Sequence, residues 1–135
     1  MPTQTLWGGR FKEPLAEIAL KFSSSIEFDK ILYGEDIAGS IAHVEMLAAV
    51  KVLTASEMRR IRTALKSIQK EIESGKFELT AQYEDVHMAI EQRLTQKIGA
   101  LGGKLHTARS RNDQIALDER LFLRTAIREI SKLVV

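Results

Sequence analysis

The sequence has 135 residues, which corresponds to about one compact domain. Apolar residues make up 44% and charged residues 28%, with only 8 Gly and 2 Pro, so a disordered or fibrous chain is excluded. The 20 Lys and Arg nearly balance the 18 Asp and Glu, which leaves anion binding to local clusters; the lack of Cys excludes disulfides and thiolate chemistry.

Neither a signal peptide nor a membrane span is indicated by the sequence. The N-terminal stretch MPTQTLWGGRFKEPL lacks a continuous apolar core, and no window approaches the ~18 uninterrupted apolar residues that a spanning helix needs. We therefore expect a soluble, cytoplasmic protein without a membrane partner.

Helical periodicity begins after the first 34 residues, where we expect extended arms and short helices. Residues 35–52 place apolar side chains at helical spacing behind two acidic residues, which favours a helix. A second helix is predicted to begin at Thr54, because Thr54 and Glu57 have the spacing of a capping box, and to stop at Gly75. Its apolar residues alternate at three and four positions: Met58, Ile61, Leu65, Ile68 and Ile72.

Two further helices complete the pattern. One is predicted over residues 84–98 and is ended by the glycine-rich run at 99–103. The other begins after Asn112 or Asp113 and reaches Val135 without a stop signal, so we expect a piece of a longer protein. Because no strand pattern persists and no internal repeat occurs, the predicted fold class is all-α.

The segment GGKLHTARSRNDQ, residues 102–114, has one large apolar side chain and is not expected to form a packed face. A Walker A loop is excluded, because the glycine spacing is wrong and Leu105 stands where Ser or Thr would bind magnesium. A small-anion site fits better, since Arg side chains bind carboxylates through two nitrogens and a helix N-terminus follows. A nucleic-acid interface and a solvated loop remain as alternatives, although no aromatic residues interleave the basic ones.

A second polar cluster lies in YEDVHMAIEQRL, where Glu84, His87 and Glu91 share a predicted helix face. This is half of a carboxylate-bridged two-metal motif whose second Glu-x-x-His is missing, so no metal is expected. His87 is then either a helix histidine held by Glu84 or Glu91, or a histidine oriented by a carboxylate to donate or relay a proton.

Four segments in one order carry a family resemblance: LWGGRF, FSSSIEFDKILYGEDIAGSIAHVEML, EDVHMAIEQRL and GGKLHTARSRNDQ. Together they resemble the N-terminal part of the argininosuccinate lyase family, in the fumarase/aspartase superfamily. The resemblance implies an N-terminal helical domain with an irregular arm at residues 1–111, and the beginning of the first long helix of a central helical bundle at residues 112–135. It further implies a homotetramer in the full-length form.

The activity implied by the resemblance is the reversible cleavage of argininosuccinate to arginine and fumarate, a step of arginine biosynthesis and the urea cycle. It needs no metal or organic cofactor. The family's later catalytic segments, including its serine loop, do not occur in these 135 residues, so the piece alone is expected to be inactive. The alternative is a non-catalytic helical module that associates with copies of itself or with a partner through its last helix.

The resemblance also assigns roles by position in the motifs. Five residues resemble substrate-binding or supporting residues of the family: Ser25, Thr107, Ser110, Arg111 and Asn112. Among them Arg111 and Asn112 resemble ligands of the succinate part of the substrate. His87 resembles a histidine that binds or relays in a supporting role, because the primary catalytic residues belong to the later segments.

Overall fold

The computed structural model describes residues 16–134, and every regular element within that range is a helix. The all-α class predicted from the sequence is thus confirmed for the described residues. The irregular arm expected before residue 16, with Trp7 and Phe11, lies outside them. The elements are α1 (Glu17–Ser23), α2 (Ile26–Asp29), the 3₁₀ helix η1 (Lys30–Leu32), α3 (Tyr33–Ala49), α4 (Ala55–Glu73), α5 (Val86–Ile98), the 3₁₀ helix η2 (Gly99–His106) and α6 (Arg111–Val134).

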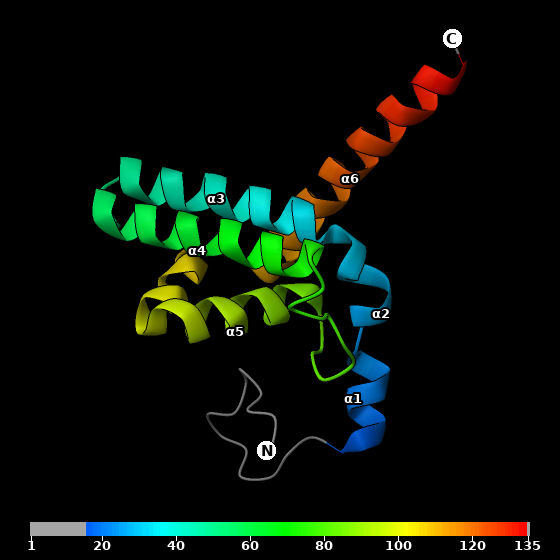
Figure 1. The fold of residues 1–135 in the computed structure, drawn as a ribbon, viewed down its shortest axis with the longest axis horizontal. Helices are drawn as coiled ribbons and strands as arrows, with labels where there is room; N and C mark the ends of the chain where they lie inside the picture. Colours follow the sequence, from blue (N-terminus) through cyan, green and yellow to red (C-terminus); the bar gives the residue numbers. More distant parts are fainter. Residues whose placement is uncertain (1–15, 135) are drawn as a thin grey trace.

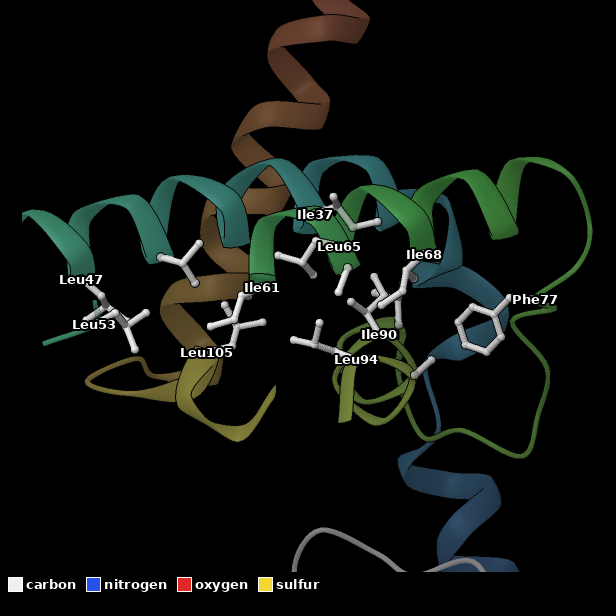
Figure 2. Packing of buried hydrophobic residues seen from close by; sticks show 14 of the residues in the cluster. Ile37, Leu47, Leu53, Ile61, Leu65, Ile68, Phe77, Ile90, Leu94 and Leu105 are labelled. Carbon is white, nitrogen blue, oxygen red and sulfur yellow. The ribbon is translucent and has the colours of Figure 1, made fainter. Parts of the chain in front are cut away.

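The hydrophobic core lies between three of these helices. Helices α3 and α4 run antiparallel and side by side, and α5 packs beneath them (Figure 1). Figure 2 shows α4 side chains such as Ile61, Leu65 and Ile68 facing Ile90 and Leu94 of α5. These five side chains are completely buried, and each contributes about 1.5–3 kcal/mol through removal from water.

The boundaries of α4 agree with the sequence pattern. Thr54 is the N-cap, its hydroxyl accepts from the backbone N–H of Glu57, and the Glu57 carboxylate accepts from the backbone N–H of Thr54. This reciprocal pair is the predicted capping box, worth about 1 kcal/mol. Gly75 has a φ of +70°, a left-handed conformation that glycine adopts without steric cost, and the chain leaves the helix there.

Three other helix starts differ from the predicted positions by a few residues. Helix α3 begins at Tyr33, so Glu35 lies in its first turn and does not precede it. Helix α5 begins at Val86 and not at Glu84, because the Asp85 side chain accepts from the N–H of Met88 at 2.6 Å and caps the helix. Helix α6 already begins at Arg111, ahead of Asn112.

The expectation that residues 102–114 form no packed face is wrong for their first half. The 3₁₀ helix η2 repeats about every three residues, which places Gly102 and Leu105 on the same side. Leu105 is 1% exposed and joins the core, and a Cβ on Gly102 would meet the Thr95 backbone at 3.0 Å. A short 3₁₀ helix rich in glycine thereby packs against α5 where no packed face was expected.

Helix α6 packs against the body only through its beginning. Gln114 and Asp118 are buried against α3, whereas the second half of the helix extends away from the other elements (Figure 1). Its exposed apolar side chains are Leu117, Leu123, Ile127, Ile130, Leu133 and Val134. Among the helices of residues 16–134, none combines the length and the hydropathy needed to cross a bilayer.

Candidate functional site

The N-terminus of α5 is joined to α2 by a set of polar contacts around Ser25. The Ser25 hydroxyl donates to Asp29 Oδ2 at 2.6 Å, and Asp29 Oδ1 accepts from the N–H of Val86 at 3.1 Å. The backbone N–H of Ser25 donates to the carbonyl of Glu84 at 2.8 Å. Ser25, predicted to bind substrate, therefore lies half-buried beside the first turn of α5, which also carries His87.

His87 lies in a buried polar cluster whose acidic members come from two other helices. Its Nδ1 donates to Asp36 Oδ1 of α3 at 3.2 Å and lies 3.5 Å from Asp118 Oδ2 of α6. All three side chains are 1% exposed or less. The proposal that Glu84 or Glu91 holds His87 is wrong: Glu84 precedes the helix, and Glu91 pairs with His106 and Arg111.

The close packing of these groups changes their acidity. Burial opposes ionisation of Asp36, but hydrogen bonds from His87 and Gln114 and the positive charge of Arg109 outweigh it and lower the pKa of Asp36. Burial also opposes the charged form of His87, yet the bond to Asp36 raises the pKa of His87. For Asp118 burial dominates, and with the negative charge of Asp36 it raises the pKa of Asp118 to about 7.

Arg109 closes the cluster between α3 and α6. Its Nη1 donates to Ser40 Oγ at 2.8 Å, and its Nη2 is 3.6 Å from the place that a Cβ on Gly39 would take. Ala108 before it has a φ of +54°, an uncommon conformation for a non-glycine residue that turns the chain between η2 and α6. The absence of a side chain at Gly39 lets α6 and the guanidinium approach α3 closely.

Arg111 begins α6 and lies at the edge of the cluster. Its Nη1 donates to Gln114 Oε1 at 2.6 Å and to Glu91 Oε1 at 3.1 Å, and its Nε is 4.0 Å from Asp85 Oδ2. The side chain is 19% exposed. Arg111 is therefore held from one side by protein groups while part of it still faces solvent.

The structure brings some of the predicted site residues together. Three of them lie around the first turn of α5, which carries His87 itself. Ser25 bonds to Asp29, which accepts from the N–H of Val86, and Arg111 lies near Asp85, the N-cap of the helix. Ser110 and Asn112 flank Arg111 and are exposed at the start of α6. Thr107 is exposed at the end of η2, where its carbonyl oxygen lies 2.9 Å from His43 Nε2 of α3.

Three members of the cluster were not predicted from the sequence: Asp36, Gln114 and Asp118. The available signal was their helix position, because Gln114 and Asp118 are four residues apart and share the face of α6 that meets α3. Asp36, His87 and Asp118 offer ligand atoms within 4.8 Å of one another, a combination that divalent cations use. The neighbouring Arg109 guanidinium supplies positive charge at that place instead.

The basic residues of the 102–114 segment do not form a free basic face. Each contacts an acidic or hydroxyl group of this chain: Lys104 with Glu57, His106 with Glu91, Arg109 with Ser40 and Arg111 with Glu91. An acidic partner accompanies Lys104, His106 and Arg111, which argues against a nucleic-acid interface.

An open pocket of about 490 Å³ lies elsewhere, between α4 and the end of α5. Its lining residues are Arg59, Arg60, Thr63, Ala64, Ser67, Lys97 and Ile98. None of the residues predicted from the sequence motifs lines it. The polar cluster between α3, α5 and α6 is therefore the better candidate site.

Fold and cluster together define an all-helical protein with a polar centre where three helices meet. The chain belongs to the lyase family, because the family model described as Lyase matches residues 9–134. It is 52% identical over 131 residues to the argininosuccinate lyase of Geobacter sulfurreducens. That alignment covers 97% of this chain and 29% of the relative. It is 57% identical over 125 residues to the argininosuccinate lyase of Ectopseudomonas mendocina, and this alignment covers 93% of this chain and 27% of the relative. The chain thus spans less than a third of the length of these curated relatives.

Proposed function

We propose that this chain supplies the N-terminal, substrate-binding part of an argininosuccinate lyase, which cleaves argininosuccinate to arginine and fumarate. The observation that carries the proposal is Arg111, a partly exposed guanidinium at the start of α6 that lies near Asp85, the residue that caps the helix carrying His87. The identity of 52–57% to argininosuccinate lyases over nearly the whole chain supports it.

The charge of the substrate explains why a fixed guanidinium is useful. Argininosuccinate carries three carboxylates, which need cationic and neutral partners before the chemical step begins. A guanidinium that is already held by protein groups loses little conformational freedom when it binds one of them. Arg111 meets this condition through Gln114 and Glu91, and the exposed Asn112 adds a neutral donor beside it.

Ser25 and the α6 N-terminus supply the remaining contacts in this proposal. Ser25 can accept or donate at the α2–α5 junction, and the first N–H groups of α6 add positive potential for a substrate carboxylate. Ser110 and Thr107 would support Arg111 from the preceding segment. His87 is buried and bonded to Asp36, so we assign it a supporting role and leave proton abstraction to groups outside this chain.

The same proposal divides the chain into two parts. Residues 1–111 would form the N-terminal domain, and residues 112–135 would begin a long helix of a central bundle shared by four subunits. The exposed apolar side chains of α6 favour such an assembly. They equally favour a second candidate function, a non-catalytic helical module that self-associates through α6.

A chimera tests the proposal, because these 135 residues can replace the matching segment of the Geobacter sulfurreducens argininosuccinate lyase. We expect the chimera to release fumarate, detected by its absorbance, and Arg111→Leu to lower kcat/KM by about a hundredfold or more, as for loss of a charged substrate contact. Arg93→Leu is the matched control, since Arg93 also binds one Glu and the Gln three residues later. Equal losses in the two variants would refute the assigned role of Arg111.

A further inference from the structure

Gln114 connects the buried cluster to Arg111. It is 1% exposed in the first turn of α6, where its Nε2 donates to Asp36 Oδ1 and its Oε1 accepts from Arg111 Nη1 at 2.6 Å. One side chain therefore joins a carboxylate of α3 to a guanidinium of α6.

The two partners leave Gln114 a single orientation. An ionised carboxylate only accepts hydrogen bonds and a guanidinium only donates them, so the amide nitrogen must face Asp36 and the amide oxygen must face Arg111. His87 and Arg109 keep Asp36 ionised, because both favour its negative charge. The amide cannot flip without facing donor against donor and acceptor against acceptor.

Arg111 is thereby fixed by two acceptors on the same nitrogen. Gln114 and Glu91 both bind Nη1, and Asp85 lies near Nε. These contacts with the described residues use Nη1 and Nε, and we take Nη2 as the nitrogen left for a ligand. A flexible arginine would lose conformational freedom when it bound a substrate carboxylate, and this arrangement has removed much of that freedom beforehand.

We propose that Gln114 is a positioning residue that orients Arg111 for a carboxylate of the substrate, with Asp36 as its fixed anchor. This inference rests on the proposed function, in which Arg111 binds that carboxylate. It assigns Gln114 to substrate binding and not to the chemical step, so its loss raises KM and leaves kcat nearly unchanged.

The first test is Gln114→Met in the chimera, because Met has a similar length and neither donates to Asp36 nor accepts strongly from Arg111. KM for argininosuccinate is expected to rise about tenfold or more, the order of effect for one hydrogen bond to a charged group, while kcat stays within about threefold. The matched control is Gln96→Met, since Gln96 Oε1 accepts from Arg93 Nη1 at 3.1 Å with the same spacing of three residues. This control should leave KM unchanged.

The second test is Gln114→Glu, which remains informative if the Met variant fails to fold. A protonated Glu donates to Asp36 and accepts from Arg111 as Gln does, whereas an ionised Glu faces Asp36 with like charge. Burial and the Asp36 carboxylate both disfavour ionisation of this Glu, so its KM relative to the unsubstituted chimera should be higher at about pH 8.5 than at about pH 6. The charged groups facing this position are Asp36, Asp85, His87, Glu91, Arg109, Arg111 and Asp118, and all are present in both proteins compared.

The outcomes separate this inference from the proposed function. An unsubstituted chimera without activity, beside an active parent lyase, contradicts the proposed function itself. An active chimera in which Gln114→Met leaves KM unchanged, or lowers only kcat, overturns the role of Gln114 alone. The role of Gln114 is also overturned if the KM of the Gln114→Glu variant, divided by the KM of the unsubstituted chimera, does not change with pH.

Discussion

Asp118 is an acidic side chain that folding removes from water without giving it a hydrogen bond. It is 0% exposed, and neither of its oxygens has a hydrogen-bond partner among the described residues. Burial and the charge of Asp36 raise the pKa of Asp118 to about 7, against the opposite influence of His87 and Arg109. The folded state therefore binds a proton that the unfolded chain has already released at neutral pH.

This proton makes stability depend on pH. Because the folded pKa of Asp118 is raised, its contribution is complete at low pH and is lost as pH rises through about 7. Between about pH 5.5 and pH 8.5 this loss amounts to about 2 kcal/mol. Asp118→Asn should flatten the dependence, measured as the free energy of urea unfolding of the 135-residue chain at several pH values. An Asp118→Asn chain with the unsubstituted slope would contradict this account, and Asp113→Asn, at an exposed position of the same helix, is the control.

For individual residues, the sequence motifs identified candidate site residues but not the side chains that contact them. Residues 84–91 indicated correctly that His87 is paired with a carboxylate. The partner was not predictable, because Asp36 is 51 positions away and reaches His87 only through packing of α3 against α5. Its place near the start of a helix indicated only an acid that favours a helix N-terminus, whereas in the fold Asp36 is buried and bonded to His87 and to Gln114 of α6.

Among the elements, α4 was predictable and η2 was not, for physical reasons. The α4 boundaries depend on local interactions, namely the capping box at Thr54 and the left-handed conformation of Gly75. Both can be recognised from the residue types and their spacing in the sequence. The 3₁₀ helix η2 has only eight residues, and three of them are glycines. Such a pattern resembles a loop, and its helical form depends on close contact between Gly102 and α5.

That close contact predicts different results for two adjacent glycines. A Cβ on Gly102 would lie 3.0 Å from both Cα and N of Thr95, and backbone atoms in a helix cannot move aside easily. We expect Gly102→Ala to lower the free energy of unfolding by about 1–3 kcal/mol, the usual cost of overpacking. Gly103→Ala has nothing within 4 Å of its Cβ and should be neutral or slightly stabilising in the same urea titration. A neutral Gly102→Ala would show that η2 does not pack as described.

For the molecule as a whole, α6 carries a surface that residues 16–134 do not cover. Leu123, Ile127, Ile130 and Val134 follow one another at spacings of four, three and four residues and so form one stripe. All four are at least 55% exposed. A seam of this kind is buried when helices associate, which is why both candidate functions include assembly.

The stripe predicts self-association of the chain through α6. Ile127→Glu places a charge in the seam and should shift the molecular mass in solution toward the monomer, measured by light scattering over a range of concentrations. Thr125→Glu adds the same charge on the opposite face of α6 and should leave the mass unchanged. A monomeric unsubstituted chain, or identical behaviour of the two variants, would contradict self-association through this face.

The central claim, that these residues form the substrate-binding part of an argininosuccinate lyase, is tested most directly by fumarate absorbance after addition of argininosuccinate. The assay compares the isolated 135-residue chain, the unsubstituted chimera and the parent Geobacter sulfurreducens enzyme. We predict fumarate from the chimera at a rate within about tenfold of the parent, a difference of about 1.4 kcal/mol in the barrier, and none from the isolated chain. A folded chimera that releases no fumarate, or an isolated chain that releases it at an enzyme-like rate, would contradict the account.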